Sequence, residues 1–301
     1  MKNRIFILLI IAAVIAGAVV SCQGLMAVAD IGAQIAGATG AIDQSTADAI
    51  SVSARALGSA AEEITPEQEY FIGRAVAANI LTNYRIWNGS PALTAYLNRI
   101  CAAITINSPR PDVYNGYHVA ILDSNDINAF ATSGGHIFVT RGLINAAKSE
   151  DALAGVIAHE LAHIQLQHSI KAIRTSRITQ ALMITGVSAA GAAGMNVSEL
   201  TDVFKESVSE IVSTLVNNGY SQAQEFEADN TAMSLLASAG YSPSGLVDML
   251  RELSSVQTAS SGFGRTHPTP AQRISNAERS VGNYRVTDTR SYRQTRFAST
   301  R

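Results

Sequence analysis

The clearest pattern of apolar and polar positions in this chain follows Ser149. Ser is a residue type that caps helix N-termini, and Glu150 and Asp151 then occupy the first turn, where carboxylates interact favourably with the helix dipole. Apolar residues recur after them at the three- and four-residue spacing of one helix face: Leu153, Val156, Ile157, Leu161 and Ile164. The pattern predicts a helix with an apolar stripe.

Two further helices are predicted nearer the N-terminus. Thr65, Pro66 and Gln68 are the residue types of an N-cap, a first helical position and a capping-box partner. A helix is therefore expected to begin there and to run past Val76. A second helix is expected over residues 90–104, and two prolines soon after it end the helical pattern.

Two short runs of β-branched and aromatic residues, 117–122 and 136–140, are separated by a segment rich in turn-forming residues. We expect them to be neighbouring strands. The chain after them is mostly helical in pattern and contains no internal repeat. The predicted fold is α+β, mainly helical with one small sheet.

The first residues have the layout of a secretory leader. Lys2 and Arg4 precede an apolar run over residues 5–20, which is short for a membrane span. The run ends in Val-Val-Ser-Cys22, which resembles a bacterial lipobox, so we expect cleavage before Cys22 and a lipid on its sulfur. The alternative is an uncleaved N-terminal anchor helix. Either reading places the rest of the chain outside the cytoplasm.

The expected organisation has four parts. Residues 1–21 are a lipoprotein-type signal peptide, and residues 22–61 are rich in Ala, Gly and Ser and form either a loose helix or a flexible tether. Residues 62–282 form the main domain. Residues 283–301 are a basic tail, expected to be solvated and poorly ordered. The apolar segment 178–195 is interrupted by polar residues and glycines, which favours a helical arm packed on the domain over a membrane hairpin.

Composition and charge exclude one class of function. The chain of 301 residues is 47% hydrophobic and 15% charged, with a net charge of −2, so it has no basic stripe for nucleic acid. If Cys22 carries a lipid, Cys101 is the remaining thiol and no intrachain disulfide can form. Cys101 lies in an apolar helical pattern, and we expect it to be a buried small hydrophobe.

The chemistry of this chain is expected on the predicted helix after Ser149. His159 and His163 are four residues apart, so both imidazoles project from one helix face and can share a tetrahedral metal ion. Glu160 stands beside them, where a carboxylate can accept a proton from an attacking water. This five-residue pattern is typical of zinc metalloproteases.

A catalytic zinc needs a third protein ligand, and the best candidate is Glu225. Asp229 lies one helical turn further on, on the same face, where it can accept a hydrogen bond from a ligand imidazole. Glu227 would point about 160° away from the metal by helix geometry. The alternative is that these acidic residues form a solvated helix face.

The chain resembles the zinc peptidases that include the bacterial heat-shock protease HtpX, the CAAX prenyl protease and their periplasmic lipoprotein relatives. The resemblance runs from about residue 117 to residue 274. It is carried by Asn128-Ala129-Phe130-Ala131, Gly134-Gly135, Val139-Thr140-Arg141-Gly142-Leu143-Ile144, the His159 to His163 motif, the Glu225 to Asp229 segment, Thr266-His267-Pro268 and Arg273-Ile274.

The resemblance implies a thermolysin-like, gluzincin-type domain whose small sheet borders the active-site cleft. It implies that His159, His163 and Glu225 bind one Zn²⁺ per chain. Glu160 is implied as the catalytic base, and Asp229 as a carboxylate behind the metal ligands.

The resemblance also brings Asn128, Gly134 and Gly135 near the substrate, which would bind as an extended strand along the edge of the sheet. One position departs from the family pattern: relatives often have Arg where this chain has Gln222. This departure puts a local polar contact in doubt, but no metal ligand.

His267 has three readings. In some periplasmic relatives a His of the corresponding loop sits on the zinc, so His267 is either a gate or a donor to the developing oxyanion. The alternative is a loop His that caps a turn before a proline. The remaining histidines match no ligand pattern and are expected at neutral surface or strand positions: His118, His136 and His168.

The sequence therefore predicts a zinc metalloendopeptidase with polypeptide substrates, held to a membrane by the lipid on Cys22. The resemblance suggests misfolded or mislocalised envelope proteins as substrates, at the periplasmic face of a bacterial envelope and in the outer membrane of a Gram-negative cell. One rival is a non-proteolytic chaperone or assembly factor that uses the same groove with a structural zinc, although a structural site needs no base such as Glu160. A second rival is an intramembrane protease, which would require several long apolar helices.

Overall fold

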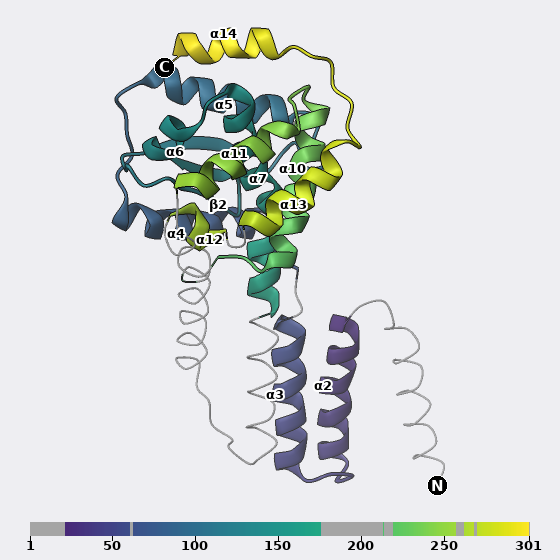
Figure 1. Ribbon diagram of the computed structural model, residues 1–301. Coiled ribbons are helices and arrows are strands. Elements are labelled where there is room, and N and C mark those ends of the chain that lie inside the picture. Colours follow the sequence, from purple (N-terminus) through teal and green to yellow (C-terminus); the bar gives the residue numbers. More distant parts are fainter. Residues whose placement is uncertain are drawn as a thin grey trace. The chain divides into compact units, whose positions relative to one another are not determined.

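The structure, a computed structural model, describes residues 22–60, 63–175, 213, 219–256, 262–267 and 270–300 (Figure 1). The chain divides into two compact units, Met1–Ile64 with Lys171–Ser209 and Thr65–Ile170 with Glu210–Arg301. The predicted leader, residues 1–21, and the apolar segment 178–195 lie outside the described residues. None of the described helices combines the length and the apolar character needed to cross a membrane.

Most of the described part of the first unit is a pair of packed helices, α2 (Cys22–Ala38) and α3 (Gln44–Ala60). The sequence left a helix and a tether open here, and the structure has helices. Their small side chains let the two backbones approach closely, since a Cβ added to Gly37 would lie 2.6 Å from the Cβ of Ala47. The Ala- and Gly-rich composition therefore serves helix packing.

The second unit contains all the candidate site residues. Its helices are α4 (Pro66–Asn83), α5 (Pro91–Thr105), α6 (Arg141–Ala146), α7 (Glu150–Gln165), α10 (Gln222–Ser238), α11 (Ser244–Val256), α12 (Phe263–Thr266), α13 (Pro270–Val281) and α14 (Arg290–Thr300). Its strands are β1 (His118–Leu122), β2 (Ala129–Thr132) and β3 (His136–Thr140). The α+β, mainly helical prediction is confirmed.

The predicted helix starts are confirmed by their caps. Thr65 and Gln68 form a capping box at the start of α4. The Ser90 side chain accepts a hydrogen bond from the Leu93 N–H, and the Ser149 side chain accepts one from the Ala152 N–H. Each cap satisfies a backbone donor that the first helical turn leaves without a partner.

The sheet has the strand order β1-β3-β2. The two predicted strands are neighbours, and they pair in parallel with His118 opposite His136. Strand β2 was not predicted; it pairs antiparallel with β3 and has Ala129 opposite Val139. Four residues between turn-forming segments give too short an alternation to indicate a strand.

Helix α7 is the centre of the second unit: α10 and α11 pack along it, and it contacts α5, α14, β2 and β3 (Figure 1). Every residue from Glu150 to Ile164 is buried. Glycines allow the close crossing with α11, because a Cβ on Gly155 would lie 2.8 Å from the Leu246 Cα and one on Gly245 would lie 2.3 Å from a backbone oxygen of α7. The predicted burial of Cys101 is also confirmed, and burial raises the pKa of its thiol to about 12.

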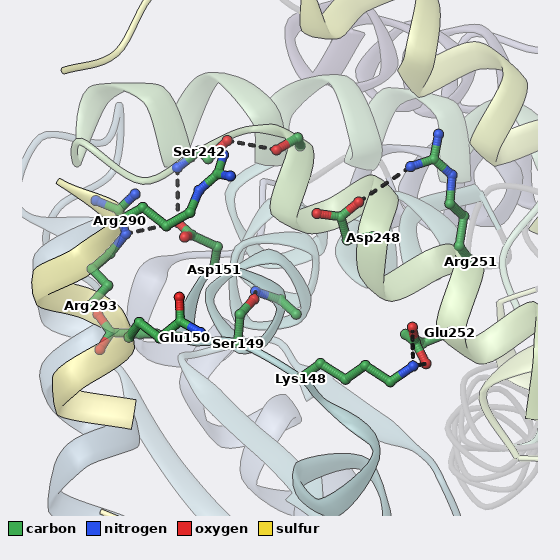
Figure 2. A pocket seen from close by; sticks show the side chains of 13 residues that line it. Lys148, Ser149, Glu150, Asp151, Ser242, Asp248, Arg251, Glu252, Arg290 and Arg293 are labelled. Carbon is green, nitrogen blue, oxygen red and sulfur yellow. Dashed lines mark hydrogen bonds and ion pairs between the residues drawn. The ribbon is translucent and has the colours of Figure 1, made fainter. Parts of the chain in front are cut away.

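The prediction of a solvated, poorly ordered basic tail is wrong for α14. Arg293 is buried, and its Nε lies 2.9 Å from the Asp151 carboxylate, while Arg296 forms an ion pair with Glu150. Figure 2 shows Arg293 and Asp151 on the wall of a cavity of about 330 Å³ at the N-terminal end of α7. A count of charges along the chain cannot show that these cations face buried carboxylates of another helix.

Candidate metal centre

The two histidines of α7 converge as their spacing predicts. Both side chains are buried, and the Nε2 atoms of His159 and His163 lie 3.1 Å apart. Two nitrogens that bind one tetrahedral zinc at about 2.0–2.1 Å would be separated by about 3.3 Å. The separation in the structure therefore suits two ligands of one ion.

Glu225 approaches the same point from α10. Its Oε2 lies 3.5 Å from His159 Nε2, and its Oε1 lies 3.6 Å from His163 Nε2. Ser221 and Gln224 form a capping box that begins α10 one turn before Glu225. Gln222, the position that departs from the family pattern, bonds to the exposed Gln272 side chain, away from the cluster.

His267 is part of the cluster rather than a surface loop residue. It follows α12 directly and is buried, and its ring stacks on Phe263 with centroids 4.2 Å apart. Its Nδ1 lies 3.1 Å from Glu225 Oε1 and 3.2 Å from His159 Nε2. The backbone N–H of His267 caps α12 by donating to the Phe263 carbonyl, while its side chain lies in the cluster.

Four residues, His159, His163, Glu225 and His267, each offer a ligand atom within 4.8 Å of the others, and all four are buried. Imidazole nitrogens and a carboxylate oxygen are ligands that zinc accepts in catalytic sites. The residues fit one such ion. Glu160 lies beside them, with Oε1 3.3 Å from His267 Nε2 and without a hydrogen bond from any described residue.

The outer nitrogen of His159 is held by a buried ion pair. Its Nδ1 lies 2.9 Å from Asp229 Oδ1, and Arg273 donates to both Asp229 oxygens at 2.7 and 2.8 Å. Burial opposes ionisation of Asp229, but the Arg273 guanidinium and the His159 imidazole together lower the pKa of that carboxyl. Burial and Arg273 likewise oppose charge on His159, yet hydrogen bonds to Asp229 and Glu225 raise its pKa to about 9 in the metal-free protein.

The outer nitrogen of His163 has a different partner. Its Nδ1 lies 2.9 Å from His168 Nδ1, and the Nε2 of His168 lies 3.3 Å from the Glu227 carboxylate. The prediction of a surface position for His168 is wrong: it is buried against His163, just after the end of α7. His118 is exposed and His136 half-buried at strand starts, as expected. Burial and the neighbouring His159 hold the pKa of His163 well below its usual value.

Two residues of the centre were given no role by sequence reasoning. Arg273 is fully buried, and its Nη1 lies 2.9 Å from Glu225 Oε2 in an ion pair. Arg273 shares the buried face of α13 with Ala277, four residues later. Because arginine is seldom fully buried without a partner, an arginine on such a face is the sequence signal that could have indicated a buried ion pair. Tyr220 stacks on His163, with ring centroids 4.0 Å apart and planes 16° apart. Burial and the charges of Glu160 and Glu225 raise its pKa well above the usual value.

The predicted substrate-binding residues fall in two places. Asn128 is buried, and its Oδ1 accepts a hydrogen bond from Thr266, the residue before His267. Gly134 and Gly135 lie in the β2–β3 turn, at the opposite end of β2, with φ of 79° and 98°. Added Cβ atoms would lie 2.5 Å from the Tyr70 Cα and 2.3 Å from the Gly116 O, respectively. The structure thus places Asn128 next to the cluster. It also explains the two glycines by packing, because a side chain at either position would clash with neighbouring backbone.

Comparison with known proteins identifies the class of this chain. Residues 91–281 match Peptidase family M48, and the chain belongs to that family. Its members are zinc-dependent metallopeptidases, so the chain is a zinc metallopeptidase whose buried cluster can bind one ion. The match confirms the resemblance drawn from the sequence motifs.

Several relatives are named as metalloproteases. The chain is 31% identical over 188 residues to metalloprotease LoiP of Escherichia coli, a match that covers 61% of this chain and 70% of LoiP. It is 27% identical over 207 residues to the β-barrel assembly-enhancing protease of the same organism, covering 65% and 40%. It is 29% identical over 192 residues to mitochondrial metalloendopeptidase OMA1 of Schizosaccharomyces pombe, covering 62% and 52%. The chain thus spans less than half of the β-barrel assembly-enhancing protease.

Proposed function

We propose that this chain is a metalloendopeptidase of gluzincin type, in which His159, His163 and Glu225 bind the zinc and Glu160 is the catalytic base. The supporting observation is the 3.1 Å approach of the two buried histidine nitrogens, with carboxylates from α7 and α10 beside them. Asp229 orients His159 from behind, as its 2.9 Å contact with Nδ1 indicates.

Bound zinc would polarise the scissile carbonyl and make water a better nucleophile at neutral pH. Glu160 then takes a proton as the water oxygen bonds to the carbonyl carbon, and gives it to the amide nitrogen as the C–N bond breaks. Its Oε1 accepts no hydrogen bond from the described residues and is therefore available for that proton.

The substrate is proposed to be an extended polypeptide that pairs with β2. Among the described strands, β2 lies at the sheet edge and pairs only with β3. Its first residue follows Asn128, which bonds to Thr266 next to the cluster, so the edge begins beside the site. Addition of a substrate strand to such an edge supplies backbone hydrogen bonds that need no particular side chains.

His267 is proposed to be a gate. Its ring lies between Glu225 and Glu160, at 3.1 and 3.3 Å, which is the space that the attacking water needs. Replacement by Ala should therefore raise the rate of casein cleavage at matched zinc occupancy. A loss on the order of a hundredfold would indicate an oxyanion donor instead. An unchanged rate would exclude both roles.

The cellular setting is proposed from the leader and the relatives. A lipid on Cys22 would hold the enzyme at the periplasmic face of the bacterial envelope, with misfolded or mislocalised envelope proteins as substrates. The name of the β-barrel assembly-enhancing protease supports an envelope role. Cys22→Ser should release the protein from membranes in cell fractionation. Continued association after an alkaline carbonate wash would contradict the lipid anchor.

The rival function is a chaperone that holds strands with a structural zinc. The test is casein digestion by the purified full chain, before and after zinc is removed by a chelator and restored. Cleavage that disappears with zinc and returns with it is expected for the peptidase. Binding of unfolded casein without cleavage at one zinc per chain would favour the chaperone.

A further inference from the structure

Tyr220 is held against the metal centre by its position in the chain. It directly precedes Ser221, the N-cap residue of α10, whose capping box fixes the backbone at this point. Its ring lies nearly parallel to that of His163, with centroids 4.0 Å apart, and 5.5 Å from the ring of His168. The phenol therefore has a defined place beside a proposed metal ligand.

The hydroxyl of Tyr220 differs from those of three other packed tyrosines of the second unit. Tyr96 and Tyr241 both donate to Glu150, at 2.8 and 3.1 Å, and Tyr117 donates to the Arg110 carbonyl at 2.7 Å. Tyrosine hydroxyls in the interior usually find such a partner. Tyr220 Oη makes no hydrogen bond with any described residue, although its ring is packed.

Its surroundings show where a partner would come from. The half-buried ring of Tyr220 also lies 6.5 Å from that of His267, whose Nε2 is 3.3 Å from Glu160 Oε1, so Tyr220 stands on the side of the cluster where the proposed base lies. Among the described residues, no hydrogen bond joins the Tyr220 hydroxyl to either carboxylate. A donor held rigidly beside a base, but left without an acceptor, suits an oxygen that arrives with the substrate.

We propose that Tyr220 is a catalytic residue whose hydroxyl donates a hydrogen bond to the carbonyl oxygen of the scissile peptide as negative charge develops there. This role rests on the proposed peptidase function. The phenol keeps its proton throughout: the water proton goes to Glu160 and then to the leaving nitrogen, and the C–N bond is the one that breaks. The hydrogen bond strengthens as the carbonyl carbon becomes tetrahedral, so it lowers the barrier.

Tyr220→Phe isolates the hydroxyl because the ring and its stacking on His163 remain. We expect kcat for a peptide substrate to fall about a hundredfold, the usual cost of an oxyanion donor, with KM and zinc affinity unchanged. Tyr292→Phe is the matched control, since Tyr292 is 72% exposed on α14. Tyr220→Leu removes the ring as well and should also weaken zinc binding.

The role of Tyr220 can also be tested by a binding measurement that involves no cleavage. A peptide with a phosphonate in place of the scissile amide mimics the developing oxyanion, so Tyr220→Phe should weaken its binding by a factor similar to the loss of kcat. The product peptide should bind as it does to wild type. Equal kcat and phosphonate affinity in wild type and Tyr220→Phe would overturn the role of Tyr220 while leaving the peptidase function intact. A zinc-loaded wild type that neither cleaves the peptide nor binds the phosphonate would overturn both proposals.

Discussion

The two candidate ligands of α7 are chemically identical, yet their outer nitrogens are held by different surroundings. Behind His159 lie Asp229 and Arg273, both fully buried. Behind His163 lie the buried His168 and then Glu227, whose side chain is 51% exposed. We call these the buried arm and the surface arm. The first is an ion pair shielded from water, and the second ends in solvent.

This difference predicts how each arm responds to damage. A charge buried without its partner costs several kcal/mol, because neither water nor a counter-ion can replace it. An exposed carboxylate loses little when its partner is removed, because water takes its place. The buried arm should therefore be needed for both stability and metal binding, and the surface arm mainly for fine positioning of His163.

The largest effect is expected from Arg273→Met, which leaves Glu225 and Asp229 without their shared cation. Breaking such a buried pair costs about 3–5 kcal/mol, measured as the free energy of unfolding of the zinc-free protein in urea. Arg279→Met, on the exposed face of the same helix, is the control and should change it by no more than about 1 kcal/mol. Equal effects of the two changes would contradict the account.

The next largest effect is on zinc content, which should differ between substitutions of two acidic residues of α10. Glu225→Ala should remove most of the bound zinc, because Glu225 faces both histidine nitrogens. Glu227→Ala should leave the zinc content near one per chain, because Glu227 contacts His168 and, among the described residues, none of the candidate ligands. Metal analysis after gel filtration measures both. Zinc loss in Glu227→Ala with retention in Glu225→Ala would mean that the ligand is wrongly assigned.

The smallest expected effect is a difference in zinc affinity between substitutions in the two arms. Substitution of a residue that contacts the outer nitrogen of a metal-binding His typically lowers metal affinity by about 10–100-fold. We expect Asp229→Ala to lie near the upper end of this range and His168→Phe near the lower end. The His168 substitution keeps the ring and removes only its nitrogens. Competition with a chromophoric zinc chelator measures both affinities. A larger loss in His168→Phe would reverse the ranking of the arms.

The predicted part of the site depends on local spacing. His159, Glu160 and His163 follow from one helix, and Glu225 and Asp229 from another, because residues four apart share a face whatever the tertiary structure does. The capping residues of α4 and α7 were predicted for the same reason: their partners lie three residues away.

The missed part depends on contacts between distant segments. Arg273 meets Asp229 across 44 positions, and His168 meets Glu227 across 59. The tail was misread for this reason, since Arg296 pairs with Glu150 across 146 positions. No local pattern shows which charge of one helix will face which charge of another. An arginine within an apolar helix stripe is a sign that one such partner exists.

The central claim is that Glu160 carries the proton while other residues hold the metal, and Glu160→Gln tests it most directly. The amide can still hydrogen-bond to water but cannot accept its proton. We predict loss of casein cleavage with zinc content near one per chain and an unchanged melting temperature. Retained cleavage at full zinc occupancy would contradict the account.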